Sequence, residues 1–128
     1  FGEALVDGVM QGPDQTTVDM AYWLMRNEGL FVGPSAALNV CGAVRLARQL
    51  KAEAPEKEHV VVTVICDSGD RYRSKMYNKE WMDEKGLHSG RELTAGLGWL
   101  DQGILTPVQR TSCTQHYYCP NLCNMTLF

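Results

Sequence analysis

The chain has 128 residues and a formal net charge of −3 at pH 7, with 45% hydrophobic and 21% charged residues. This length is enough for one domain, and the composition is typical of a globular protein and not of a disordered one. The mild negative charge argues against the basic surface that binds nucleic acid or an anionic membrane. The longest apolar run, residues 60–66, is far too short to span a membrane. We therefore expect a globular domain with no nucleic-acid partner and no membrane partner.

The first elements predicted along the chain are a short strand over residues 4–11 and a helix that follows Gly12-Pro13. Asp14 is predicted as the N-cap, because its carboxylate can accept hydrogen bonds from the free amides of the first turn. Apolar residues recur along one face of this helix, and Gly29 is expected to end it. The apolar face is formed by Val18, Ala21, Tyr22 and Met25.

A second helix is predicted after Gly33-Pro34, with Ser35 as its cap. Its first half is rich in small residues, so this end can approach another backbone closely. The charged residues 51–58 then lead into Val60–Cys66, a continuous and mostly β-branched run. Such a run is typical of a strand that is buried on both faces of a sheet. The buried face of the helix is predicted to carry Val40, Ala43, Val44 and Ala47.

Asn78 is predicted to cap a short third helix that contains Trp81 and Met82 and closes at Gly86. The order strand, helix, helix, strand, helix predicts an α/β fold with a parallel sheet. After residue 87 no segment has a clean helical or strand period. We therefore divide the chain into an α/β part, residues 1–87, and a divergent irregular tail, residues 88–128, which we expect to be poorly ordered.

The clearest candidate site is Asp67-Ser68-Gly69-Asp70, directly after the predicted buried strand. In open α/β sheets, ligands bind beyond the carboxyl ends of the strands. A hydroxyl and two carboxylates on this turn can bind a polar cofactor atom, although a capped turn without a ligand is the commoner explanation. Gly33-Pro34-Ser35 can receive an anion at a helix start, but plain capping explains it as well.

Other chemistry-bearing residues give weaker signals. His59, His88 and His116 have no evident acid–base partner and are predicted to be solvated or structural. The run Cys113-x2-His116-x2-Cys119-x3-Cys123 offers four soft ligands, whereas structural zinc sites usually join two separated ligand pairs. An odd number of cysteines without a secretion signal favours reduced thiols in an intracellular protein. Because of the unusual ligand spacing, we expect a tail of reduced thiols here and predict no metal site.

Three segments in succession match motifs of one known family. Residues 27–35, Asn-Glu-Gly-Leu-Phe-Val-Gly-Pro-Ser, look like the E-G-L-x-x-G-x-S segment of cysteine synthases and cystathionine β-synthases. Residues 62–72, Val-Thr-Val-Ile-Cys-Asp-Ser-Gly-Asp-Arg-Tyr, resemble the family's strand and D-S-G-[ED]-R-Y turn. Residues 73–87 are similar to the end of one cysteine-synthase-like subgroup. The match covers roughly residues 4–87 in the family's order and spacing.

The resemblance implies an enzyme of the tryptophan-synthase-β-like fold (fold type II), built on three-layer parallel-sheet domains that bind pyridoxal 5′-phosphate between them. It also implies β-replacement, in which an activated serine such as O-acetylserine loses its leaving group and sulfide adds to give cysteine. Such proteins are usually homodimers. The family's D-S-G serine hydrogen-bonds the pyridine nitrogen, and this role carries over to Ser68. A neutral hydroxyl there suits β-elimination better than transamination, because the ring stays less electron-poor.

The family's Schiff-base lysine and its phosphate loop have no counterpart in this sequence and are expected upstream of it. The chain opens with Phe1, which predicts a processed product or a piece of a longer reading frame. No catalytic residue is therefore assigned, and the chain alone is expected to be inactive. The lysines that do not match are Lys51, Lys57, Lys75, Lys79 and Lys85.

We expect the C-terminal portion of a cysteine-synthase-like enzyme of the cytoplasm or mitochondria, with an amino-acid substrate and sulfide as its small-molecule partners. The alternative is a non-catalytic truncated α/β fragment that acts, if at all, by binding a partner. An upstream Ser/Thr-x-Lys motif together with a glycine-rich loop would distinguish the enzyme from this alternative.

Overall fold

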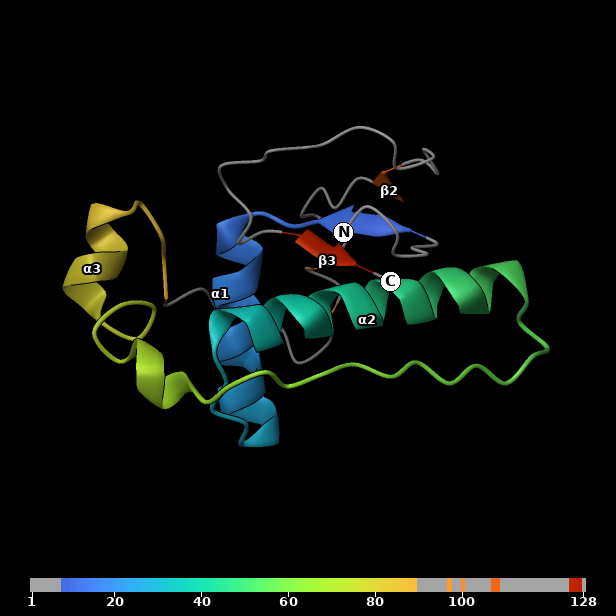
Figure 1. Cartoon of the computed structure of the whole chain (residues 1–128), viewed down its shortest axis with the longest axis horizontal. Helices are drawn as coiled ribbons and strands as arrows, with labels where there is room; N and C mark the ends of the chain where they lie inside the picture. Colours follow the sequence, from blue (N-terminus) through green and yellow to red (C-terminus); the bar gives the residue numbers. More distant parts are fainter. Residues whose placement is uncertain (1–7, 90–96, 98–99, 101–106, 109–124, 128) are drawn as a thin grey trace, which may run out of the picture.

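The computed structural model describes residues 8–89, 97, 100, 107–108 and 125–127. Figure 1 shows the long helix α2 crossing α1, with a small sheet on one side of α2 and α3 near one end. None of the helices in these ranges is long and apolar enough to cross a membrane. The elements are β1 (Val9–Gln11), α1 (Asp14–Trp23), a π-helical turn η1 (Leu24–Glu28), α2 (Pro34–Glu53), a 3-10 turn η2 (Gly69–Tyr72), α3 (Lys79–Glu84), β2 (Pro107–Val108) and β3 (Met125–Leu127).

The first helix begins and ends close to its predicted limits, but its cap differs. Pro13 is the N-cap residue and Asp14 is the first helical residue, with no side-chain cap. The Pro13 carbonyl accepts from the amides of Thr16 and Thr17 at 3.1 and 3.3 Å. Asp14 therefore places a negative charge in the first turn, where it complements the helix dipole, and does not cap it. Gly29 ends the helical run as predicted, with a left-handed φ of 68° that glycine adopts without strain.

The second helix begins at Pro34 with Gly33 as its N-cap, so the prediction of Ser35 as the cap is wrong. Proline suits the first helical position because the amide that it lacks would have no helical partner there. The small residues at this end are buried and pack closely on α1, as predicted. The predicted face is only half-buried, because α1 covers a neighbouring face of the helix. The core between the two helices includes Val18, Met20, Ala21, Leu24, Ala36, Ala37 and Cys41.

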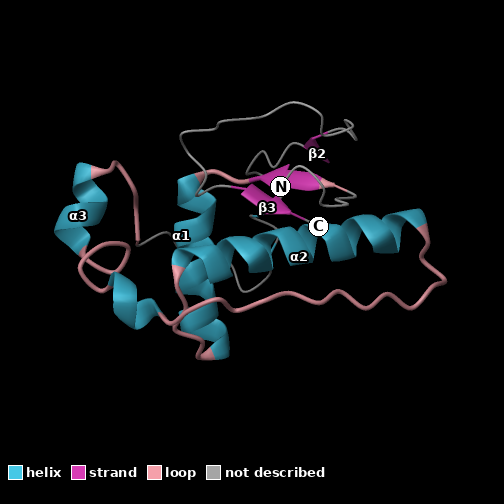
Figure 2. Cartoon of the chain, viewed as in Figure 1, coloured by secondary structure: helices cyan, strands magenta, loops and turns pink. Residues whose placement is uncertain are grey.

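The prediction of a buried strand over Val60–Cys66 is wrong for this structure. The segment has no regular structure and runs back along α2, with no strand paired to it among the described residues (Figure 2). Val60 and Val62 are 83% and 85% exposed. A β-branched run fills the interior of a sheet only where strands pair with both its edges and layers cover both its faces. Cys66, which lies at the end of this run, is exposed as well.

The sheet in the described part of the chain is antiparallel, so the expected parallel sheet is not formed there. β1 is the central strand and pairs with β2 on one edge and with β3 on the other. β2 and β3 belong to the predicted tail, residues 88–128, and β3 also lies against α2. Two short pieces of the tail, and not residues 60–66, therefore supply the strand partners. Of the rest of the tail, residues 88–89, 97 and 100 are described, and Leu100 is buried in the core with Leu97 packed against it. The remaining residues of the tail lie outside the described part of the chain.

The third helix agrees with the sequence prediction. The side chain of Asn78 caps α3 by accepting a hydrogen bond from the Trp81 amide at 2.8 Å. Met82 is 1% exposed, and Gly86 follows the helix with a left-handed φ of 65°. Strong local signals, a cap and a glycine, were sufficient to locate this element.

Candidate functional site

Two motifs that the sequence singled out separately lie against each other. Residues 31–33, before α2, run antiparallel to residues 67–69, and Val32 forms an isolated bridge with Ser68. Two backbone hydrogen bonds, of 3.0 and 3.1 Å, flank this bridge. The candidate turn is therefore held at the N-terminus of α2. The two bonds run from Gly33 N to Asp67 O and from Gly69 N to Phe31 O.

Gly33 permits this close approach because it has no side chain. A Cβ at this position would lie 2.1 Å from Oδ1 of Asp67 and 2.7 Å from Cε2 of Tyr72. Gly69 packs in the same way, since a Cβ there would lie 2.8 Å from Cε2 of Phe31. Both contacts are well inside van der Waals distance, so the pairing of the two segments depends on glycine at both positions.

Asp67 and Tyr72 close the turn over Gly33. The Tyr72 hydroxyl donates a hydrogen bond to Oδ2 of Asp67 at 2.7 Å. The other oxygen, Oδ1, is buried and meets no hydrogen-bond donor among the described residues. Asp67 thus braces the turn.

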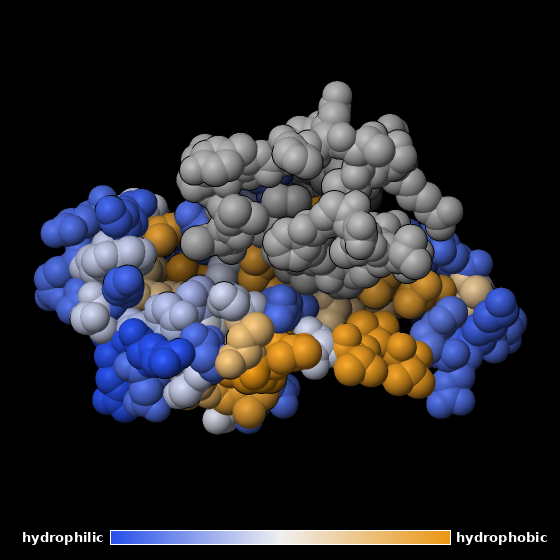
Figure 3. All heavy atoms as spheres, in the orientation of Figure 1, coloured by the Kyte–Doolittle hydropathy of each residue, from blue (hydrophilic) through white to orange (hydrophobic). Residues whose placement is uncertain are grey.

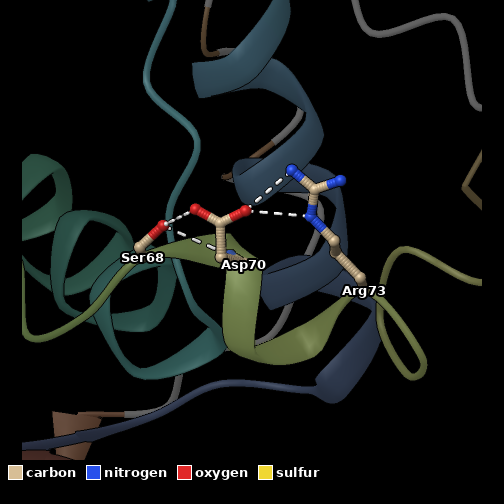
Figure 4. Close-up of polar contacts among 3 residues, drawn as sticks. All are labelled: Ser68, Asp70 and Arg73. Carbon is tan, nitrogen blue, oxygen red and sulfur yellow. Dashed lines mark hydrogen bonds and ion pairs between the residues drawn. The ribbon is translucent and has the colours of Figure 1, made fainter.

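Ser68, Asp70 and Arg73 form a chain of hydrogen bonds on the exposed side of the turn (Figure 4). Ser68 Oγ accepts from the Asp70 amide at 3.2 Å and donates to Oδ2 of Asp70 at 2.9 Å. The Arg73 guanidinium contacts the other oxygen, Oδ1, through Nε at 2.9 Å and Nη2 at 2.7 Å. The bond from Ser68 and the guanidinium of Arg73 lower the pKa of the Asp70 carboxyl, because both favour its charged form.

Aromatic side chains support the backbone that carries this turn. The ring centroids of Phe31 and Tyr77 lie 4.5 Å apart, and the Tyr77 hydroxyl donates a hydrogen bond to the Val32 carbonyl at 2.7 Å. Burial, together with the nearby Tyr22, raises the pKa of Tyr77 to about 12. The strand-like segment 31–33 is therefore held from both sides, by Tyr77 and by the turn.

Asn39 is a residue of the site that the sequence reading missed. Its Nδ2 donates to the Val64 carbonyl at 3.0 Å and to the Cys66 sulfur at 3.3 Å. These bonds hold the end of the extended segment against α2, just before the turn begins. The available signal was an asparagine within an apolar helix, at a position where propensity disfavours it.

Most of the other chemistry-bearing residues lie away from the turn and make contacts of their own. His59 contacts the Ala54 carbonyl at 3.0 Å, and the backbone amide of His88 donates to Gln15. Lys79 pairs with Asp83 on α3. The run Cys113-x2-His116-x2-Cys119-x3-Cys123 lies outside the described residues, and within those residues no three potential ligands gather as a metal site.

The turn fits one part of a pyridoxal 5′-phosphate site. Ser68 is exposed and offers a neutral hydroxyl, which is the type of group that hydrogen-bonds a pyridine nitrogen. The described residues form no glycine-rich cradle for a phosphate at the start of α2. A shallow hollow on α2 does not include the turn. It is lined by Val44, Ala47, Arg48, Lys51 and Ala52.

No family model matches the chain, whereas several individual proteins do. A cysteine synthase of Dictyostelium discoideum is 46% identical over 84 residues, which are 66% of this chain and 21% of that protein. Cysteine synthase 2 of Schizosaccharomyces pombe is 40% identical over 87 residues, 68% of this chain and 21% of that protein. A Mycobacterium tuberculosis protein named L-cysteine desulfhydrase Cds1 is 32% identical over 87 residues, 68% of this chain and 23% of that protein.

The chain thus spans about a fifth of the length of the curated relatives that it matches. The identities are high enough for homology, and they confirm the resemblance that the residues around Gly33 and Ser68 indicated. Over about two thirds of its length the chain is homologous to part of the cysteine synthases, which is consistent with a piece of a protein of that family.

Proposed function

We propose that the turn at Ser68 and the start of α2 form the ring-nitrogen side of a pyridoxal 5′-phosphate site. The complete protein would use this site to make cysteine from an activated serine and sulfide. The observation that carries the proposal is the exposed Ser68 hydroxyl, held against α2 by the pairing of residues 31–33 with 67–69. Homology to proteins named cysteine synthases supports the reaction class. When bound, the cofactor would supply an electron sink for the amino-acid substrate.

The residues of this chain would position the cofactor ring. Ser68 offers the ring nitrogen a neutral partner, which leaves the ring less electron-poor than a carboxylate partner would. The hydrogen bond between Tyr72 and Asp67 keeps the turn closed, and Gly33 lets it approach α2. The position of the hydroxyl is therefore set by the backbone on both sides of it.

Substitution of Ser68 in the complete protein tests this proposal. We expect Ser68→Asp to lower β-replacement turnover while the cofactor remains bound, because a carboxylate would hold a proton on the ring nitrogen more firmly than the neutral hydroxyl does and would make the ring more electron-poor. Ser68→Thr keeps a hydroxyl and is the matched control. Turnover is measured as cysteine formed from O-acetylserine and sulfide, and bound cofactor is measured separately after gel filtration. Unchanged turnover in Ser68→Asp would exclude Ser68 from contact with the ring.

A second reaction has support from one relative, whose name describes the removal of sulfide from L-cysteine. The same turn could serve either direction of sulfide chemistry, since both reactions make or break a bond at the β-carbon. Assays of the complete protein with L-cysteine, and with an activated serine plus sulfide, separate the two. We expect cysteine formation to be the faster reaction.

The alternative from another class is a chain that acts by binding a partner and has no catalysis of its own. The exposed apolar side chains of Val60, Val62, Val64 and Ile65 support it. Titration of pyridoxal 5′-phosphate into the 128-residue chain, followed by dialysis, tests whether this chain forms a cofactor site of its own. We expect no stoichiometric covalent adduct to survive, because none of its five lysines matches the family's covalent lysine. A stable adduct lost in one specific lysine variant would show that this chain forms its own site.

A further inference from the structure

The Ser68 hydroxyl has one proton, and in the structure that proton is donated to Asp70. We propose that Asp70 and Arg73 are positioning residues, which fix the rotamer of Ser68 and compete with an incoming ring nitrogen for its hydroxyl proton. The part of this proposal that concerns the ring nitrogen rests on the proposed function. The part that concerns the rotamer is a property of the chain alone.

The Ser68 hydroxyl has a limited hydrogen-bonding capacity. A serine hydroxyl has one donor and two acceptor positions. Oδ2 of Asp70 takes the donor at 2.9 Å, and the Asp70 amide occupies one acceptor position at 3.2 Å. One acceptor position is left. In this arrangement Ser68 can accept a hydrogen bond from a protonated ring nitrogen, but it cannot donate one to an unprotonated ring nitrogen.

Arg73 orients the Asp70 carboxylate toward the Ser68 hydroxyl. Its Nε and Nη2 both contact Oδ1 of Asp70, which leaves Oδ2 directed at Ser68 (Figure 4). The Arg73 guanidinium also lies over the Phe31 ring, 5.7 Å from its centroid. It therefore contacts the segment that pairs with the turn. The side chains of Arg73 and Asp70 are 74% and 62% exposed. Exposed pairs of this kind contribute little to folding stability, so variants at both positions are expected to fold.

The charge on Asp70 decides the competition. Among the described residues, Ser68 and Arg73 are the groups that lower its pKa, and the Asp67 carboxylate is bonded to Tyr72 instead. Asp70 is therefore ionised near neutral pH and accepts the Ser68 proton. Protonation of Asp70 in acid removes this strong acceptor and frees the hydroxyl.

The first arm of the test uses the 128-residue chain and measures the χ1 rotamer populations of Ser68 from proton–proton couplings. We expect one dominant rotamer at neutral pH and a redistribution as pH falls through the pKa of Asp70. Asp70→Ala should redistribute the rotamers at neutral pH, and Arg73→Gln should do so partly. Asp83→Ala is the matched control, because Asp83 is an exposed carboxylate paired with Lys79 away from the turn. Unchanged Ser68 rotamers in Asp70→Ala, with the fold intact by circular dichroism, would overturn the proposal.

The second arm uses the complete protein loaded with pyridoxal 5′-phosphate labelled with nitrogen-15 in its ring. We expect Asp70→Ala to move the ring-nitrogen chemical shift toward that of an unprotonated nitrogen that accepts a hydrogen bond. A shift in Ser68→Ala but none in Asp70→Ala would overturn the competition and leave the proposed function standing. No shift in Ser68→Ala, with the rotamer response intact in the first arm, would overturn the proposed function and the competition, and leave only the rotamer control.

Discussion

Tyr72 donates a 2.7 Å hydrogen bond to Oδ2 of Asp67, while Oδ1 of the same carboxylate is buried without a donor among the described residues. A half-buried carboxylate with one bonded oxygen depends strongly on that bond. Because Asp67 O also receives the Gly33 amide, the side-chain bond and the backbone pairing stabilise the same turn.

Tyr72→Phe is expected to destabilise the fold by about 1 to 3 kcal/mol, because it leaves both oxygens of Asp67 without a donor in the described part of the chain. The loss is measured by urea unfolding, and hydrogen exchange at the Gly33 and Gly69 amides should accelerate. Tyr22→Phe is the control, since its hydroxyl makes a longer bond, 3.3 Å, to the Met76 carbonyl. An equal loss of stability in both variants would mean that the hydrogen bond to Asp67 contributes no more than the longer bond to Met76.

Gly33→Ala is expected to destabilise the fold by about 1 to 3 kcal/mol, because its new methyl group would overlap Asp67 and Tyr72. Gly8→Ala is the control, since a Cβ there meets nothing within 4 Å. The double variant Gly33→Ala, Asp67→Ala should recover part of the loss if the overlap is the cause. Thermal unfolding of the unsubstituted chain, Gly33→Ala, Asp67→Ala and the double variant checks this coupling.

Cys66 is expected to react rapidly with a thiol-alkylating reagent at pH 8, whereas Cys41 should react only after unfolding. Cys66 is exposed and Cys41 is buried. Burial, together with the nearby Asp19, raises the pKa of Cys41 to about 12, so almost no reactive thiolate forms there. Peptide mass mapping after timed alkylation, with and without urea, measures both rates. Early labelling of Cys41 in the folded chain would contradict the packing of α1 on α2.

Alkaline pH is expected to destabilise the fold through Tyr77. Its pKa is raised to about 12 from an ordinary value of 10.0, so the folded state favours the neutral phenol. The stabilisation is complete below pH 10 and is lost as pH rises from 10 toward 12, because the unfolded chain releases the proton first. Melting temperatures measured across this range should fall less steeply in Tyr77→Phe than in the unsubstituted chain. Parallel slopes would remove Tyr77 as the cause.

Val62→Lys is expected to reduce self-association of the 128-residue chain without lowering its stability. Val62 is 85% exposed in the apolar run after α2, and Figure 3 shows orange, hydrophobic surface on this face of the molecule. Exposed β-branched segments with unpaired edges favour aggregation, and a lysine opposes it. Thr63→Lys adds the same charge but removes no apolar side chain, so it should help less. Light scattering against concentration measures the difference.

Local signals in the sequence predicted the helices well, because each has a nearby cause. Asn78 caps α3, and Gly29 ends the first helical run in a left-handed conformation. The caps of α1 and α2 were misplaced by one or two residues, since Pro13 and Gly33 provide backbone geometry that a search for side-chain caps overlooks.

Features that depend on distant partners were harder to predict. The run Val60–Cys66 has the composition of a buried strand, yet burial requires neighbouring strands that are not among the described residues. At the candidate site, the sequence identified Ser68 and the start of α2 but not their contact. That contact depends on the absence of a side chain at Gly33 and on the tether from Asn39, which no local pattern reveals.

The hydrogen bonds around the turn also differ in the sequence separation between their two partners. Tyr72 and Asp67 are 5 positions apart, so their bond can form as soon as the turn does. Asn39 and Val64 are 25 positions apart, and Tyr77 and Val32 are 45. Longer loops cost more entropy to close, and long-range contacts slow folding. During refolding we therefore expect the helices and the isolated turn to form early, and the docking of Ser68 onto the start of α2 to be among the last steps.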